Sequence, residues 1–177
     1  MNRTLIFGYG SLINLRSVEG TTKRKMQESD LSVVHLNGWA RAWSYVVNCV
    51  FDGDGDQPTA TLFLNIEREA SSILPGVIFE VSQKELTLID AREYGYTRIN
   101  VTDGVDQDQG ATIYSYIASP GFDSPTHEAV IPAQYHDIVS LGARNWGEEF
   151  EQSFWGTTKP HQFQQKPGDY GPYYPPS

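Results

Sequence analysis

The sequence is poor in cysteine and in basic residues, with one cysteine and 13 lysines and arginines against 22 acidic residues in 177. A lone cysteine, Cys49, excludes an intramolecular disulfide. The net charge of −9 makes nucleic acid an unexpected partner, because phosphate recognition needs clustered Lys and Arg. The chain also lacks a run of about 20 apolar residues and a signal peptide, so we expect no membrane association and a cytoplasmic location.

Metal and cysteine chemistry have little support in the sequence. The segment Asp52-Gly-Asp-Gly-Asp56 resembles the start of a calcium loop, but Gln57 stands where glycine is needed and Phe63 where a bidentate Glu is needed. A connection between strands is favoured instead, and we expect no metal. Cys49 lies in an apolar run with no histidine near it in sequence, which favours a core thiol over a nucleophile. The histidines are scattered, with no pair at helical spacing: His35, His127, His136 and His161.

The most informative segment is Thr4-Leu-Ile-Phe-Gly8-Tyr9-Gly10-Ser11-Leu12. An apolar run that ends in two glycines predicts a strand entering a tight turn. Such a turn can direct several backbone N–H groups at one anion, although an ordinary turn with glycine at positive φ explains the pattern equally well. Ile13 stands where a dinucleotide fingerprint needs glycine, and no Walker A sequence exists, so we expect no cofactor.

The remaining pattern predicts an α+β fold, since several strands are followed by helices. Residues 14–30 are polar and indicate a loop or a short helix. Ser82 and Glu85 form a capping-box signature, which predicts a helix ending near Ala91. Pro132 suits the first turn of a later helix, and residues 148–155 suggest another short one. Strands are expected at residues 4–7, 33–50 (one or two, with a bend at Gly38), 60–66, 76–81, 96–102 and 111–118.

The C-terminal residues differ in composition from the rest. From Lys159 onward the chain is rich in Pro, Gly, Gln and Tyr. This composition predicts an extended tail that is disordered or lies on the surface. We therefore expect one folded domain over residues 1–158 and a Pro/Tyr-rich tail over residues 159–177.

Two side chains are candidates for chemistry from their position alone. Glu93 follows the predicted helix, where an acidic residue is either solvated, paired with Arg92 or Arg98, or catalytic. Ser11 follows the glycine turn, but it lacks the second glycine of a serine-hydrolase elbow. The residues alone leave both interpretations open.

Four segments, taken in order, resemble the γ-glutamylcyclotransferase superfamily, including its ChaC-like and γ-glutamylamine cyclotransferase-like branches. The turn is similar to the family's Y-G-S loop, and residues 75–81 to its G-x-x-[FY]-x-[IL] strand. Residues 88–93 are similar to the L-D-x-x-E segment that holds the family's catalytic glutamate. Residues 135–143 look like the C-terminal helix in which a tyrosine contributes to the pocket.

The resemblance implies a small mixed β-barrel with flanking helices and an enzyme that cyclises a γ-glutamyl group to 5-oxoproline, releasing an amine. It implies Glu93 as the acid–base catalyst. It also implies a substrate pocket formed by Tyr9, Gly10, Ser11, Leu12, Tyr96 and Tyr135.

The sequence leaves several questions about function open. The substrate can be glutathione, a γ-glutamyl amino acid, a γ-glutamyl amine or an acylated antibiotic intermediate. A binding module that holds a γ-glutamyl or other carboxylate metabolite without turnover is the alternative, and a hydrolase using Ser11 is a third, weaker one. The sequence does not indicate an oligomeric state.

Overall fold

The computed structural model describes residues 3–55, 57–107, 109–120 and 125–174. Asp56, the last residue of the Asp/Gly segment, and residues 175–177 of the tail lie outside this part. The strands are β1 (Arg3–Gly8), β2 (Leu31–Phe51), β3 (Thr59–Glu80), β4 (Tyr96–Asn100), β5 (Ala111–Ala118), β6 (Val130–Pro132), β7 (Gln164–Lys166) and β8 (Tyr170–Pro172). The helices are α1 (Leu15–Thr22), α2 (Gln83–Arg92), α3 (Ala133–Asn145) and α4 (Glu148–Gly156), with 3₁₀ turns η1 (Ser11–Ile13), η2 (Glu28–Asp30) and η3 (Thr102–Gly104).

The strands form one mixed sheet in the order β4-β5-β1-β3-β2-β8. β1 pairs antiparallel with β3 and parallel with β5, so the first strand lies in the middle of the sheet. The path is not closed, but the segment after β4 returns to the edge of β2 through a single bridge between Leu36 and Val105. Helices flank this sheet, and the predicted α+β class is confirmed.

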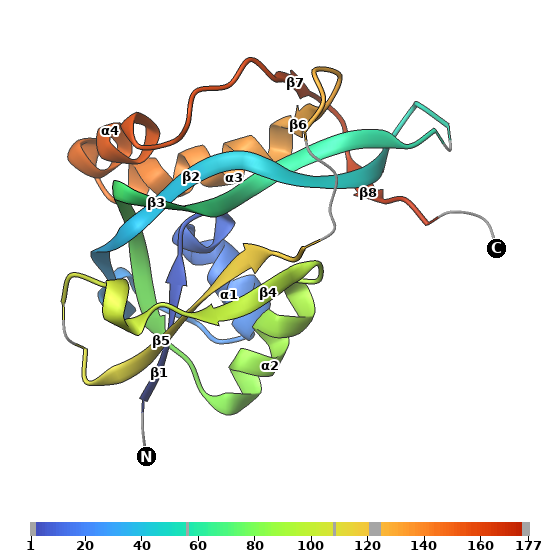
Figure 1. The fold of residues 1–177 in the computed structure, drawn as a ribbon. Coiled ribbons are helices and arrows are strands. Elements are labelled where there is room, and N and C mark those ends of the chain that lie inside the picture. Colours follow the sequence, from blue (N-terminus) through green and yellow to red (C-terminus); the bar gives the residue numbers. More distant parts are fainter. Residues whose placement is uncertain (1–2, 56, 108, 121–124, 175–177) are drawn as a thin grey trace.

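The long hairpin of β2 and β3 dominates the molecule (Figure 1). We predicted two strands, at residues 60–66 and 76–81, where the structure has one strand of 22 residues. The intervening residues are polar and partly exposed, which hides the strand pattern, yet they stay in the ladder because β2 runs beside them. Gly38, at φ +79°, lies at a shift in this ladder, in agreement with the predicted bend.

Local sequence signals set the two helices that surround the N-terminal turn. Residues 14–30 contain a short helix, α1, because the Asn14 side chain caps its first turn by accepting from the N–H groups of Arg16 and Ser17. The predicted capping box of α2 is confirmed, with Ser82 and Glu85 bonded in both directions. The helix ends at Arg92, and Glu93 is its C-cap residue.

The C-terminal helices lie along the hairpin (Figure 1). α3 begins at Ala133, one residue after Pro132, and α4 follows it directly. The segment after α4 then returns across the sheet, where β8 pairs antiparallel with the end of β2. In the described part of the chain, no helix combines the length and the apolar character needed to cross a membrane.

Candidate active site

A cavity of about 670 Å³ opens where the N-terminal turn, the end of α2, the hairpin and α3 meet. Ser11 from the turn and Arg92 and Glu93 from α2 line one side. The sheet and α3 contribute mostly apolar and aromatic side chains: Tyr45, Val47, Cys49, Phe63, Tyr96, Tyr135 and Ile138. Four of the predicted site residues, Ser11, Glu93, Tyr96 and Tyr135, are therefore together at one cavity.

Glu93 is the single acidic side chain among the described residues that line the cavity. Its backbone N–H caps α2 by donating to the carbonyl of Ile89, and this fixes the residue at the helix end. The side chain is only 16% exposed. Burial raises its pKa, and the nearby Arg92 guanidinium, with Nε 3.6 Å from Oε1, partly opposes this shift. A raised pKa makes this carboxylate a better proton acceptor than an ordinary glutamate.

Arg92 connects Glu93 to the N-terminal turn. Its Nη2 donates to Ser11 Oγ and Ser17 Oγ, both at 2.9 Å, and Nη1 donates to Thr21 Oγ1 at 3.0 Å. In the sequence, Arg92 is recognisable only as a neighbour of Glu93. Its partners lie about 70 to 80 positions earlier in the chain, so only the tertiary fold reveals the role.

The glycines of the turn are needed for a different reason from the positive φ that the sequence predicted. Neither Gly8 nor Gly10 has a positive φ, so the ordinary explanation for glycine in this turn does not apply. Glycine is needed for space: a Cβ on Gly8 would lie 2.8 Å from the carbonyl oxygen of Leu12, and one on Gly10 would lie 2.9 Å from the Tyr135 hydroxyl. The turn is therefore packed directly against α3.

Tyr9 and Leu12 do not present their side chains to the cavity. Both are 6% exposed, and the Tyr9 hydroxyl donates to the carbonyl of Tyr116 at 2.7 Å. Of the turn residues, Ser11 lines the cavity, and Tyr9, Gly10 and Leu12 do not. The first hydrogen bond of the turn runs from Ile13 N–H to Gly10 O, so the N–H groups of Ser11 and Leu12 have no partner within the turn.

Arg41 of β2 contacts the turn through a hydrogen bond to its backbone. It is fully buried, and its guanidinium donates to the carbonyls of Tyr9 at 2.7 Å, Pro75 at 2.6 Å and Phe154 at 2.8 Å. It also lies 3.4 Å above the Phe154 ring. Burial lowers the Arg41 pKa to about 9. The sequence contained a signal for this residue, since an arginine inside an apolar strand needs several acceptors.

Aromatic rings form much of the cavity lining. The Tyr45 and Tyr96 ring centroids are 4.3 Å apart, and those of Phe63 and Tyr135 are 4.9 Å apart. The Tyr96 hydroxyl donates a hydrogen bond to the carbonyl of Leu64 at 2.8 Å. Burial and then the Glu93 carboxylate raise the pKa of Tyr135, so its hydroxyl stays protonated and can donate a hydrogen bond.

The C-terminal segment completes the cavity. Tyr170 to Tyr174 all line it, and the Tyr170 ring packs 5.7 Å from Phe51 and 5.9 Å from Phe63. The composition of this tail predicts a disordered segment or one that lies on the surface, and within residues 164–172 it forms two short strands, β7 and β8. The tail thus contributes residues to the candidate site.

A model of the ChaC-like protein family matches residues 4–141 of the chain. The chain belongs to this family. The match includes the turn, α2 and Glu93, and most of α3, and these segments contribute Ser11, Arg92, Glu93, Tyr135 and Ile138 to the cavity lining. No curated protein matches the sequence.

Solved structures place the ChaC-like chain in the expected fold. An uncharacterized human protein, loc79017, aligns with a TM-score of 0.61 at 19% identity, over 96% of this chain and 95% of that one. A γ-glutamyl cyclotransferase aligns with a TM-score of 0.60 at 18% identity, over 91% and 90%. YkqA from Bacillus subtilis aligns with a TM-score of 0.55 at 16% identity, over 88% of this chain and 54% of that one. At these identities the comparison shows a shared fold.

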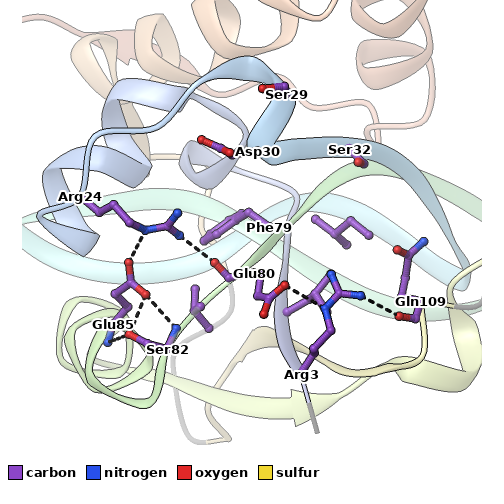
Figure 2. A pocket seen from close by; sticks show the side chains of 13 residues that line it. Arg3, Arg24, Ser29, Asp30, Ser32, Phe79, Glu80, Ser82, Glu85 and Gln109 are labelled. Carbon is purple, nitrogen blue, oxygen red and sulfur yellow. Dashed lines mark hydrogen bonds and ion pairs between the residues drawn. The ribbon is translucent and has the colours of Figure 1, made fainter. Parts of the chain in front are cut away.

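A second hollow, of about 540 Å³, lies beside β1 and the start of α2 (Figure 2). Its charged groups are already paired within the protein. Arg24 Nε contacts Glu85 at 2.5 Å, and Arg3 Nε contacts Glu80 at 2.9 Å (Figure 2). The Glu93 cavity of this ChaC-like chain is therefore the better candidate for a reaction site.

Metal and serine-hydrolase chemistry gain no support from the described residues. Among them, no three His, Cys, Asp or Glu side chains lie close enough together to hold a metal ion. Ser11 Oγ accepts its hydrogen bond from Arg92. The histidines contact other groups: His35 contacts Asp106, His127 contacts Glu128, and His136 and His161 contact Trp43.

Proposed function

We propose that this ChaC-like protein is a γ-glutamylcyclotransferase, which converts a γ-glutamyl group to 5-oxoproline and releases an amine, amino acid or peptide. The observation that carries the proposal is the buried Glu93 carboxyl, which shares a cavity with Ser11 and is joined to it through Arg92. The proposed substrate is a small γ-glutamyl compound.

The reaction is an intramolecular aminolysis. The α-amine nitrogen attacks the γ-carbonyl carbon of the same group, a five-membered ring closes, and the original amide C–N bond then breaks. Because the nucleophile is tethered to its electrophile, the protein mainly has to impose the geometry. Good intramolecular orientation lowers a barrier by on the order of 7–11 kcal/mol.

Glu93 carries the proton in this proposal. Its carboxylate removes one proton from the α-ammonium, and the resulting acid gives that proton to the departing nitrogen. The attacking nitrogen loses a second proton as the lactam forms, and this proton passes to the released amine, which leaves as an ammonium. A raised pKa suits both steps, since the group must exist in either form near neutral pH. Proton transfer of this kind contributes on the order of 10²–10⁴-fold in rate.

The turn and Tyr135 are proposed to bind the charged and polarised ends of the substrate. The N–H groups of Ser11 and Leu12, together with the Arg92 guanidinium, suit the α-carboxylate. The protonated Tyr135 hydroxyl, which lies against Gly10, suits the oxyanion that forms on the γ-carbonyl. Tyr96 shapes the aromatic wall, and Tyr9 and Gly10 act through the shape of the turn.

The test is an assay of 5-oxoproline with a panel of γ-glutamyl compounds. We expect Glu93→Gln to lower turnover on the order of 10²–10⁴-fold. Glu128→Gln is the matched control, because the Glu128 side chain is 83% exposed and should not affect turnover. Ser11→Ala should keep measurable activity, which a serine nucleophile would not allow. Thermal stabilisation by these compounds without product at any enzyme concentration would instead identify a binding module.

A further inference from the structure

The part of the cavity beyond Glu93 is aromatic and apolar. Tyr45 and Phe63 lie with ring centroids 6.3 Å apart, and Tyr170 continues the row 5.9 Å from Phe63. Val47 and Pro172 extend the same wall. A γ-glutamyl group held at Glu93 and the turn would direct its leaving amine toward this wall.

Charge in the cavity is confined to the other end. Of the described residues that line it, one is cationic, Arg92, and hydrogen bonds to Ser11, Ser17 and Thr21 hold it beside the turn, where the α-carboxylate is proposed to bind. A second carboxylate, on the leaving group, would meet aromatic and apolar side chains and, among the described lining residues, no second cation. Burying an unpaired carboxylate is costly.

We propose that this wall selects γ-glutamyl amides whose leaving amine is apolar and carries no carboxylate, with Tyr170 as a specificity-determining residue. The inference rests on the proposed function and names the leaving group that this function would release. It excludes γ-glutamyl peptides and amino acids as the preferred substrates.

Tyr170 is held in place by the fold around it. β8 pairs with β2 at Phe51, and Tyr173 N–H donates to the carbonyl of Asn48 at 2.9 Å. Just before the strand, Asp52 N–H donates to the carbonyl of Asp169 at 2.9 Å, and Lys166 pairs with Asp54 at 2.8 Å. These contacts fix the backbone on both sides of Tyr170, and its ring packs on Phe51 and Phe63, so the side chain can act as a wall of the site.

The first experiment compares substrates that differ only in one feature. γ-Glutamylphenethylamide and γ-glutamylphenylalanine differ by the carboxylate of the leaving group. We expect kcat/KM to be at least about tenfold higher for the phenethylamide, and equal or higher values for γ-glutamylphenylalanine would overturn the inference. γ-Glutamylethylamide lacks the ring and measures the aromatic contribution.

The second experiment changes the wall. Tyr170→Ala should lower kcat/KM about tenfold for the phenethylamide and less than twofold for the ethylamide, and Tyr170→Phe should restore the preference. Gln164→Ala, on the exposed strand β7, is the control. An equal loss for both substrates would mean that Tyr170 is only structural. Val47→Lys should raise kcat/KM for γ-glutamylphenylalanine by supplying the missing cation.

Binding to Glu93→Gln, measured by calorimetry, separates this inference from the proposed function. If no compound is turned over by the wild type but the phenethylamide still binds about tenfold more tightly than γ-glutamylphenylalanine, the proposed function fails and the preference stands. Equal affinities, or no binding of any compound, would overturn the inference even if turnover is found.

Discussion

Burial of the Glu93 carboxyl group in the cavity should lower the free energy of unfolding at neutral pH. Burial raises its pKa above the ordinary 4.5, so the folded state binds a proton that the unfolded state has already lost. The free energy of unfolding should therefore fall as pH rises from about 4.5 through the raised pKa, and stay low above it.

Glu93→Gln should reverse this effect, because the amide cannot ionise. We expect the variant to be more stable than the wild type at pH 7, with a difference that shrinks as pH falls to 4. Urea denaturation midpoints at the two pH values measure it. If the wild type instead gained on the variant as pH rises, the carboxylate would be stabilised by Arg92 more than burial disfavours it.

Arg41 joins the turn to β3 and α4 through buried hydrogen bonds. Arg41→Ala would leave the carbonyls of Tyr9, Pro75 and Phe154 without their donor in a buried place, and we expect a loss of about 3–5 kcal/mol in the free energy of unfolding. Arg144→Ala is the control, since its side chain is 68% exposed and its ion pair with Glu151 is a surface one. Similar losses for the two variants in urea denaturation would contradict this assignment.

At the scale of elements, the contact between the N-terminal turn and α3 depends on the missing side chain of Gly10. Gly10→Ala would place a methyl group against the Tyr135 hydroxyl, and we expect a loss of about 1–3 kcal/mol in stability. The double variant Gly10→Ala/Tyr135→Phe should recover part of the loss, since it removes the colliding oxygen.

Gly20 supplies the matched control for this prediction. It lies inside α1, where an added Cβ has nothing within 4 Å, so Gly20→Ala should stabilise the protein by about 0.5–1 kcal/mol. Thermal denaturation of the three variants tests the set. If Gly10→Ala is as well tolerated as Gly20→Ala, the turn is not packed against α3 as described.

At the scale of the whole molecule, the elements that local sequence signals determine were predictable, and those that depend on long-range packing were not. The capping box at Ser82 and the apolar strand before Gly8 act over a few residues, so the sequence predicted α2, the first strand and the position of Glu93 well. The continuous strand β3 was not predictable in this way, because its polar middle is held by the partner strand β2 and by Lys159, which pairs with Glu67 and Glu69. Tyr170 was missed for the same reason, as its partners lie more than 100 positions earlier.

The division of the chain after residue 158, predicted from composition, can be tested directly. A chain ending at Gly168 loses β8 and the Tyr170 ring, which covers Phe51 and Phe63. We expect a loss of about 2 kcal/mol in the free energy of unfolding, measured by urea denaturation. Tyr174→Ala is the control, because this side chain is 78% exposed and its removal should cost less than about 0.5 kcal/mol.

Cys49 gives a second readout of the same truncation. It is 3% exposed in the full chain and pairs with Pro172 of β8, and burial raises the pKa of its thiol. Because the thiolate is the reactive form, a thiol reagent should modify the full chain slowly and the truncated chain faster. If both stability and modification rate were unchanged, the tail would be an appendage, and the boundary after residue 158 would stand. If both change, the folded unit extends through Tyr170, and the cavity is complete only with it.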